Sequence, residues 1–355
     1  MLLLALIGVE VAISWRCDLQ GQVPPPVPRV WEGRAVTGSI KNYSRPEDDT
    51  YLSYPEWYIV WGYQEKADFQ EKHLPGEFPY FGAVRQYWNG YCCISRLTRG
   101  KYAFNGGEQL MLVVIGMSFS AEYVLKGVYE KSVGRISEWT SSYQPVEEDQ
   151  YAYKVAREYA DFVHIRPFYE FRFRPHLKGL WSETSLWGWH PARKWERKMF
   201  LTVDYAIEAF YCWLIEKLTY ISYGHELAET YAWIGNANET LFQQLPQVEK
   251  AQQVGPQAFI VSIPRYQEFT SVASRLAELN AHFVEIAGNT QIIVSVLAPE
   301  SWHYGQTDGR PLFSTPILTH PELKRFVIGC DVTSLHTVLN ALAAGDARIE
   351  HVYDY

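Results

Sequence analysis

The side chains best suited to chemistry gather in one short stretch of the chain. They are two histidines, one glutamate and two arginines: His164, Glu170, Arg172, Arg174 and His176. Histidine titrates near neutral pH, and arginine binds carboxylates or phosphates through two parallel hydrogen bonds. One interpretation is an acid-base pair or an anion clamp, with His164, Glu170, Arg172 and His176 as catalytic candidates. Structural salt bridges use the same residue types, so the spacing does not decide between the two.

Sequence motifs for known cofactor chemistry do not occur in the chain. It contains no glycine-rich phosphate loop, dinucleotide fingerprint or nucleophile elbow. His225 and Glu226 begin like a zinc-protease motif, but Glu229 stands where the second histidine belongs. We therefore expect no cofactor and no metal. The net charge of -8 argues against nucleic acid as a partner, because binding to phosphates requires clustered basic residues.

The cysteines give no pairing signal. Their number is odd and no CxxC spacing occurs among Cys17, Cys92, Cys93, Cys212 and Cys330. Neither a disulfide framework nor a zinc site is indicated. We expect scattered buried thiols.

The first residues of the sequence form an apolar run that extends to Trp15 and holds one charge, Glu10. As a helix it rises about 22 Å, whereas a hydrocarbon core is about 30 Å thick. It ends on Trp15 and Arg16 rather than on the small residues of a signal cleavage site. We interpret residues 1–16 as a membrane anchor helix, with an uncleaved signal sequence as the alternative. The basic residues that follow the run, Arg16, Arg29, Arg34 and Lys41, predict a body on the cytoplasmic side of a bacterial inner membrane.

Beyond the anchor, the pattern predicts a Pro-rich extended linker over residues 17–50 and a helical domain over residues 51–235. Ser53 and Glu56 have capping-box spacing, so the first helix should begin near Ser53. Apolar residues then recur at helical spacing in several segments. The predicted helices cover residues 53–72, 80–98, 107–139, 147–165 and 191–222.

Aromatic and basic residues interleave in part of this helical domain. The chain has 13 Trp and 25 Tyr, concentrated before residue 235. Cations beside aromatic rings suit a segment that lies on an anionic membrane surface. We therefore predict a partly interfacial domain with membrane lipid and other membrane protein subunits as partners. The predicted contact residues are Arg172, Arg174, Trp181, Trp187, Trp189, Arg193, Trp195 and Arg197. The alternative is a solvated basic face whose rings pack into the core.

The pattern changes after a polar linker at residues 236–257. Strand signals appear at residues 258–264, 282–286 and 290–297, and Gly288-Asn289 predicts a tight hairpin. Later segments predict a further strand, helix and strand. Two strand-helix-strand halves favour a ferredoxin-like α/β sandwich over residues 258–355. The fold class is therefore α+β, with a membrane-anchored, aromatic-rich helical domain followed by this sandwich.

Two runs of sequence, SYPEWYIVW (residues 53–61) and IGMSFSAEYVLKGVYEKSVGR (residues 115–135), resemble stretches of uncharacterised bacterial membrane proteins. The resemblance covers about residues 50–220 and omits the C-terminal module. It implies a bacterial membrane setting, and it implies no activity, cofactor or functional residue.

Three functional hypotheses follow. The first is a non-catalytic, membrane-anchored accessory or structural subunit of a larger membrane protein complex. The second is a membrane-interfacial enzyme that acts on a lipid or another amphiphile through the four catalytic candidates. The third is a small-ligand sensor in the C-terminal module, where the loop of residues 301–311 contains His303, Asp308 and Arg310.

Overall fold

The computed structural model describes residues 8, 17–23, 40, 43–222 and 229–354, with residues 218–222 described by their backbone. Apart from Gly8, the predicted anchor helix over residues 1–16 lies outside the described residues. The same is true of most of the predicted Pro-rich linker over residues 17–50.

Helices of the N-terminal half form where apolar residues recur at helical spacing. They are α3 (Asp49–Gln70), α4 (Tyr80–Thr98), α5 (Gly106–Tyr129), α6 (Arg135–Thr140), α7 (Glu147–Val163), α8 (Phe173–Glu183) and α9 (Pro191–Ser222). The five predicted helices are confirmed, with ends shifted by a few residues. A π-helical turn, Glu130–Gly134, joins α5 to α6.

Within the described residues, one helical stretch is long and apolar enough to cross a membrane. It is Gly106–Thr140, and the judgement rests on length and composition alone.

Two compact units make up the chain. The helical unit contains Trp57–Arg85 and Met117–Glu226, and the sheet unit contains Ser14–Glu56, Gln86–Gly116 and Leu227–Tyr355. Helices α3, α4 and α5 each contribute residues to both units.

Aromatic rings form much of the core of the helical unit. The ring of Tyr159 lies 4.8 Å from that of Tyr63 and 5.0 Å from that of Phe171, edge to face in both cases. Phe119 and Tyr123 pack at 4.1 Å. Such pairs add about 0.5–1.5 kcal/mol to the stabilisation from buried area. The sequence left core and interface roles open for the aromatic residues, and these residues take the core role.

The sheet unit contains two antiparallel sheets of four strands. The first has the order β2-β3-β1-β4 and comprises β1 (Glu229–Gly235), β2 (Glu249–Gly255), β3 (Ala258–Pro264) and β4 (His282–Ile286). The second has the order β6-β7-β5-β8 and comprises β5 (Gln291–Pro299), β6 (Arg310–Ile317), β7 (His320–Asp331) and β8 (Arg348–Val352).

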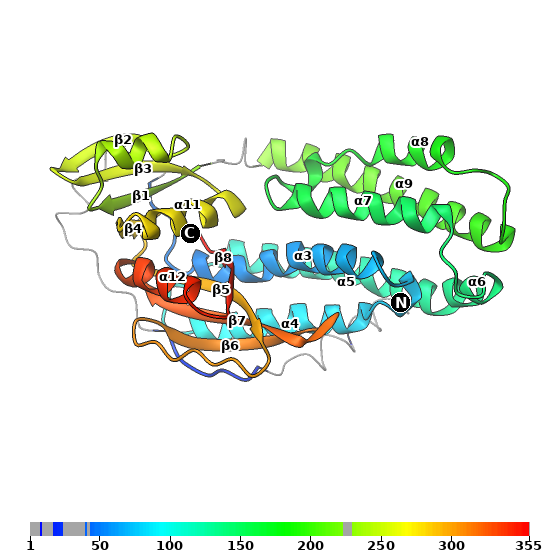
Figure 1. Ribbon diagram of the computed structural model, residues 1–355, viewed down its shortest axis with the longest axis horizontal. Helices are drawn as coiled ribbons and strands as arrows, with labels where there is room; N and C mark the ends of the chain where they lie inside the picture. The colour runs from blue at the N-terminus through cyan, green and yellow to red at the C-terminus, as the bar shows by residue number, and fades with distance from the viewer. Residues whose placement is uncertain (1–7, 9–16, 24–39, 41–42, 223–228, 355) are drawn as a thin grey trace. The chain divides into compact units, whose positions relative to one another are not determined.

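Both sheets repeat one connectivity. In each, the first strand in the chain pairs with the third and the fourth, and a helix joins the third strand to the fourth. These helices are α11 (Gln267–Glu278) and α12 (Leu335–Ala343), and Figure 1 shows them between the two sheets. One apolar cluster includes Val261 and Val294 from the two sheets together with Leu276 and Leu339 from the two helices. The two sheets therefore share one core.

The start of α3 packs on the second sheet within the same unit. The hydroxyl of Thr50 donates to the carbonyl of Tyr353 at 3.3 Å and accepts from the backbone N–H of Ile293 at 3.2 Å. The ring of Tyr54 meets the ring of Phe313 edge on at 5.0 Å. A buried threonine hydroxyl thus pairs with one backbone group on β5 and one just after β8, so it both donates and accepts a hydrogen bond.

The structure confirms a mixed α+β protein whose helical region is followed by antiparallel sheets, and it differs from the predicted sandwich. Two sheets replace the single expected sheet of residues 258–355, and the first sheet includes β1 and β2. The expected linker at residues 236–257 holds α10 (Glu239–Gln244) and β2. Most residues of β2 are exposed and polar, so this strand lacks the alternating apolar pattern that marks a half-buried strand.

A tight turn forms next to the predicted position, with Ala287 and Gly288 as its central residues, and it does not form a hairpin. Ala287 and Gly288 have φ angles of 49° and 73°, as a two-residue turn requires, and Ile286 and Asn289 exchange backbone hydrogen bonds. Beyond the turn, β4 pairs with β1, while β5 pairs with β7 and β8. The hairpin prediction is therefore wrong, because turn chemistry is local and strand pairing depends on partners far away in the sequence.

A disulfide bond joins Cys17 to Cys93 in the sheet unit. Cys92, Cys212 and Cys330 are free and buried. The expectation of thiols only is therefore wrong for one pair. Spacing gave no signal because the two cysteines are 76 residues apart and meet only in the folded chain.

Candidate functional site

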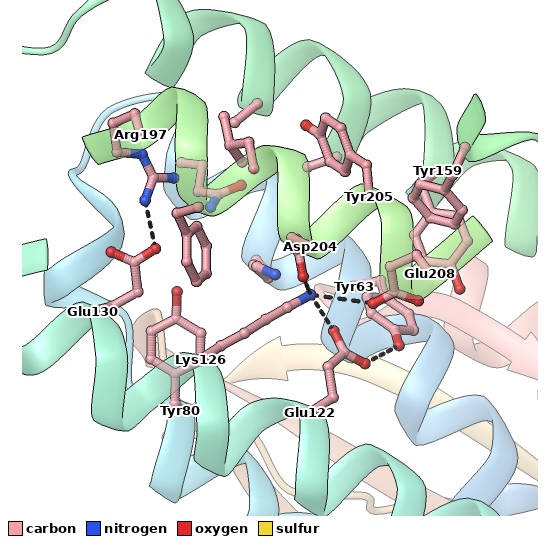
Figure 2. Close-up of a pocket in the computed structure, with 17 residues that line it drawn as sticks. Tyr63, Tyr80, Glu122, Lys126, Glu130, Tyr159, Arg197, Asp204, Tyr205 and Glu208 are labelled. Carbon is pink, nitrogen blue, oxygen red and sulfur yellow. Dashed lines mark hydrogen bonds and ion pairs between the residues drawn. The ribbon is translucent and has the colours of Figure 1, made fainter. Parts of the chain in front are cut away.

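A polar cavity lies inside the helical unit (Figure 2). Residues of α3, α5, α7 and α9 make up most of its lining, and α4, α8 and the π-helical turn each contribute one residue. Its volume is about 60 Å³, which is room for a few water molecules. Its ionisable lining residues are Lys66, Glu122, Lys126, Glu130, Arg197, Asp204 and Glu208, together with Tyr63, Tyr80, Tyr159 and Tyr205. So many charges inside a helical bundle make this cavity the candidate site.

Lys126 is the centre of the first ion cluster. Its Nζ lies 2.8 Å from Glu122 Oε1, 2.9 Å from Asp204 Oδ1 and 3.3 Å from Glu208 Oε1. Glu122 and Lys126 are four residues apart on α5, and Asp204 and Glu208 are four apart on α9, so each pair shares one helix face. Figure 2 shows the lysine extending between the three carboxylates. Tyr63 donates a hydrogen bond of 2.7 Å to the other Glu122 oxygen.

Two of the ionisable side chains in the cavity, Glu208 and Lys66, have shifted pKa values. Burial is the largest cause, and the negative charge of Glu122 the second, that raises the pKa of Glu208 to about 7. Burial, and to a lesser extent the positive charge of Lys126, lowers the pKa of Lys66. The Lys66 ammonium lies 5.7 Å from the centre of the Tyr123 ring. The cluster therefore contains a carboxyl group that exchanges a proton near neutral pH.

A second ion cluster adjoins the cavity at the start of α9. Arg197 pairs with Glu130 at 2.7 Å and with Asp149 at 2.9 Å, and Arg193 pairs with Asp149 at 2.9 Å. Lys198 pairs with Glu148 at 3.4 Å. The basic first turns of α9 meet the acidic first turn of α7, where negative charge is favoured by the helix dipole. The cluster thus holds α7, α9 and the π-helical turn together.

The π-helical turn between α5 and α6 makes room for the Glu130 carboxylate. Gly134 lies one turn after Glu130, and a Cβ at this position would stand 2.5 Å from Glu130 Oε2. A larger residue at this position would require the Glu130 carboxylate to move, so glycine leaves room for the partner of Arg197 where it lies.

The structure gives three of the four catalytic candidates from the sequence separate partners and leaves the fourth exposed. His164 Nδ1 lies 2.7 Å from the carbonyl oxygen of Ala160, and Glu170 pairs with Arg166 at 3.8 Å. Arg172 is exposed. His176 Nε2 lies 3.6 Å from Glu158 Oε2, and its ring stacks on Phe171 at 5.1 Å. Among the contacts of the described residues, none joins two of the four candidates.

The predicted contact residues divide into two sets. Arg193 and Arg197 are 0% and 1% exposed and belong to the interior ion cluster, which places them away from a lipid surface. In the sequence, these two arginines look like part of a solvated basic face, because the acidic residues that pair with them lie far away along the chain. Arg172 and Arg174 are exposed. Trp181, Trp187 and Trp189 are also exposed, and Trp195 packs between the rings of Trp181 and Trp187.

Sequence reasoning missed the cluster around Lys126. The spacing of four residues among Glu122, Lys126 and Glu130 is visible in the sequence, and so is that of Asp204 and Glu208. The available signal was charge at regular positions in otherwise apolar helices. It did not show that the two charged faces meet.

Comparison with known proteins finds no matching family model, no similar curated protein and no similar solved structure. The fold and the site define the class: a mixed α+β protein with a helical unit built around buried ion clusters and a sheet unit of two repeated antiparallel sheets.

The proton affinity of Glu208 predicts how stability depends on pH. The folded carboxyl has a pKa of about 7, above the ordinary 4.5, so the folded state retains a proton that the unfolded chain has released. The contribution of this group to stability is therefore complete below pH 4.5 and is lost as pH rises through 7. Over that window we expect a decrease of up to about 3 kcal/mol.

Glu208→Gln should flatten this part of the pH profile, because glutamine stays neutral. Melting temperatures measured from pH 5 to pH 8 would test this. Asp161→Asn, at an exposed position on α7, is the matched control and should keep the wild-type slope. An unchanged slope in Glu208→Gln would exclude this group as the origin.

Proposed function

We propose that this protein is a non-catalytic accessory subunit of a membrane protein complex, and that its helical unit lies with an apolar face against lipid. The observation that carries the proposal is the orientation of side chains on α5, α6 and α9, which turn charges inward and apolar groups outward. The exposed apolar side chains are Leu125, Val128, Val133, Ile136, Trp139, Met199, Val203, Ile207, Phe210 and Trp213. A helix on the surface of a water-soluble protein has the opposite arrangement.

These side chains follow helical spacing. On α9, Met199, Val203 and Ile207 are four residues apart and form one stripe, while Asp204 and Glu208 face the cavity. Helix α9 lies next to α5, because Lys126 of α5 pairs with Asp204 and Glu208 of α9. Contiguous exposed apolar groups of this kind mark contact with lipid or protein, whereas single exposed residues need no explanation.

Exposed tryptophans at one end of this helix pair favour lipid as the occupant. Trp139 ends the stripe on α6, and Trp187 and Trp189 precede α9; they are 70%, 75% and 89% exposed. Both helix ends meet there, because Arg193 at the start of α9 donates to Ser137 of α6 at 2.8 Å. Tryptophan concentrates at membrane-water interfaces, where its apolar ring and polar N–H are both satisfied.

The separate partners of His164, Glu170 and His176, with Arg172 exposed, support the non-catalytic form of the proposal over the enzyme hypothesis. A general acid-base pair requires groups within hydrogen-bond reach of one reacting centre. The proposal includes the anchor predicted over residues 1–16 and a bacterial inner-membrane location. A small-ligand sensor in the C-terminal module is kept as a separate proposal, which rests on the loop of residues 301–311.

Placing negative charge on the α9 stripe is expected to weaken membrane binding about tenfold. The double variant Val203→Asp with Ile207→Asp adds two charges at exposed positions, so folding should be preserved. Flotation with phosphatidylethanolamine and phosphatidylglycerol vesicles would measure binding, using protein that lacks residues 1–16 so that the predicted anchor does not contribute. Gln144→Asp with Gln150→Asp adds the same charge at exposed positions of the α6–α7 segment and should float like the wild type. Equal flotation of the two double variants would contradict the lipid contact.

The subunit part of the proposal is tested by native purification. Extraction from native membranes in a mild detergent, followed by mass spectrometry, should identify defined partner proteins in fixed ratios. Recovery of the chain as a lone monomer would count against an accessory role and leave the lipid contact to be judged by flotation.

A further inference from the structure

The disulfide between Cys17 and Cys93 closes a long loop and fastens the segment of residues 17–23. The two Cα atoms are 5.2 Å apart, within the usual range for a bridge. It ties this segment to α4, which contains Cys93. A bond that spans so much chain removes many conformations from the unfolded state.

Non-covalent contacts hold the same segment in place. The backbone N–H of Gln20 donates to the carbonyl of Leu312 on β6 at 2.8 Å, and its side chain donates to Ser314 at 3.3 Å. Lys101 donates to the carbonyl of Val23 at 2.5 Å, and the Val23 side chain is buried. The segment therefore contacts β6, an edge strand, and pairs with one of its open backbone groups, the carbonyl of Leu312. The disulfide is therefore one of several contacts that hold an ordered segment of the fold.

The other cysteines are protected. Cys92, Cys212 and Cys330 are all buried. Burial raises the pKa of each thiol, to about 12 for Cys212 and Cys330. A protonated, enclosed thiol reacts poorly, because the thiolate is the form that attacks disulfides. The described cysteines are thus either paired or shielded, which is the arrangement that survives in an oxidising environment.

We infer that this protein folds in an oxidising compartment, with its sheet unit on the side of the membrane away from the cytoplasm. Disulfides form and persist in such compartments and are rare in the reducing cytosol. The inference reverses the side predicted from Arg16, Arg29, Arg34 and Lys41. Long domains cross membranes largely regardless of their charge, so these residues do not oppose export of the body.

Formation of the bond requires an oxidant, and a protein dithiol oxidase with an active-site disulfide is the class that fits. The thiolate of one cysteine attacks that disulfide and forms a mixed disulfide. The second thiolate then displaces the oxidase, and the bond between Cys17 and Cys93 closes. Two electrons pass to the oxidase, which leaves as a dithiol, and the two thiol protons are released or taken up by it.

Thiol trapping in cells would test the inference on the full chain. Cells are quenched in acid, free thiols are blocked with N-ethylmaleimide under denaturing conditions, and disulfides are then reduced and labelled with a heavier maleimide. We expect the heavier label on Cys17 and Cys93 alone. A reporter alkaline phosphatase fused after Tyr355, active only outside the cytoplasm, should be active. Blocked Cys17 and Cys93, or an inactive phosphatase beside a fluorescent cytoplasmic reporter, would overturn the inference.

Cys92 and Cys93 provide a matched pair of variants. Both are buried on α4, and only Cys93 is bonded. Cys93→Ala should lower the melting temperature of the oxidised protein by roughly 10 °C, and reduction of the wild type should give a similar decrease. Cys92→Ala should retain the cross-link. Loss of the cross-link in Cys92→Ala, with retention in Cys93→Ala, would refute the pairing on which the inference stands.

Discussion

Lys126→Met is expected to lower the free energy of unfolding by about 3–5 kcal/mol at pH 8. Lys126 is the ammonium at which Glu122, Asp204 and Glu208 converge at 2.8–3.3 Å. Methionine has a similar volume and no charge, so packing changes little. The three carboxylates then face one another inside the helical unit without their shared cation, and breaking a buried ion pair from one side leaves uncompensated charge.

Urea unfolding followed by circular dichroism would measure this loss. The loss should be smaller at pH 5 than at pH 8, because protonation of carboxylates removes their mutual repulsion. Lys178→Met is the matched control: Lys178 is exposed on α8, and its replacement should change stability by no more than about 0.5 kcal/mol. If both variants unfold alike at pH 8, the cluster does not stabilise the helical unit.

Arg193→Met is expected to cost about 3 kcal/mol or more of folding stability. Its guanidinium is fully buried and donates to Ser137 at 2.8 Å, Asp149 at 2.9 Å and Glu196 at 3.0 Å. Removing it takes a buried cation away from the carboxylates of Asp149 and Glu196, and uncompensated buried charge is strongly destabilising. The effect should appear in unfolding.

The matched control for Arg193 is Arg172→Met, since Arg172 is exposed and belongs to the same basic, aromatic stretch. It should leave unfolding unchanged and weaken binding to anionic vesicles modestly. Measuring both unfolding and vesicle binding separates the two roles. Arg193→Met that unfolds like the wild type but loses vesicle binding would show that this arginine acts at a lipid surface.

The helices illustrate what can be predicted from local pattern. The predicted helix at residues 147–165 is α7, Glu147–Val163, and the prediction for residues 191–222 matches α9, Pro191–Ser222. Both follow from apolar residues at helical spacing, a property of neighbouring positions in the chain. Strands with continuous apolar runs, such as β3 and β5, were found for a similar reason.

Elements whose partners are distant were missed or misplaced. Strand β2 is polar and exposed, and it is a strand because it pairs with β3. A tight turn formed at Gly288, yet β4 pairs with β1 while β5 pairs with β7 and β8, so the two strands belong to different sheets. The two sheets have the same connectivity, and nothing in the sequence marks the division between them. The predicted strands were therefore assigned to a single sandwich.

The candidate site shows the same division. Sequence alone determined that α5 and α9 are amphipathic, and that charge recurs at every fourth position among apolar residues, because both are periodic properties of one chain segment. Only the tertiary structure decided that these charges turn inward and neutralise one another, and that Cys17 meets Cys93. A charge has the same appearance in a sequence whether its partner is water, lipid or a carboxylate on another helix. Which of these it meets is settled by packing.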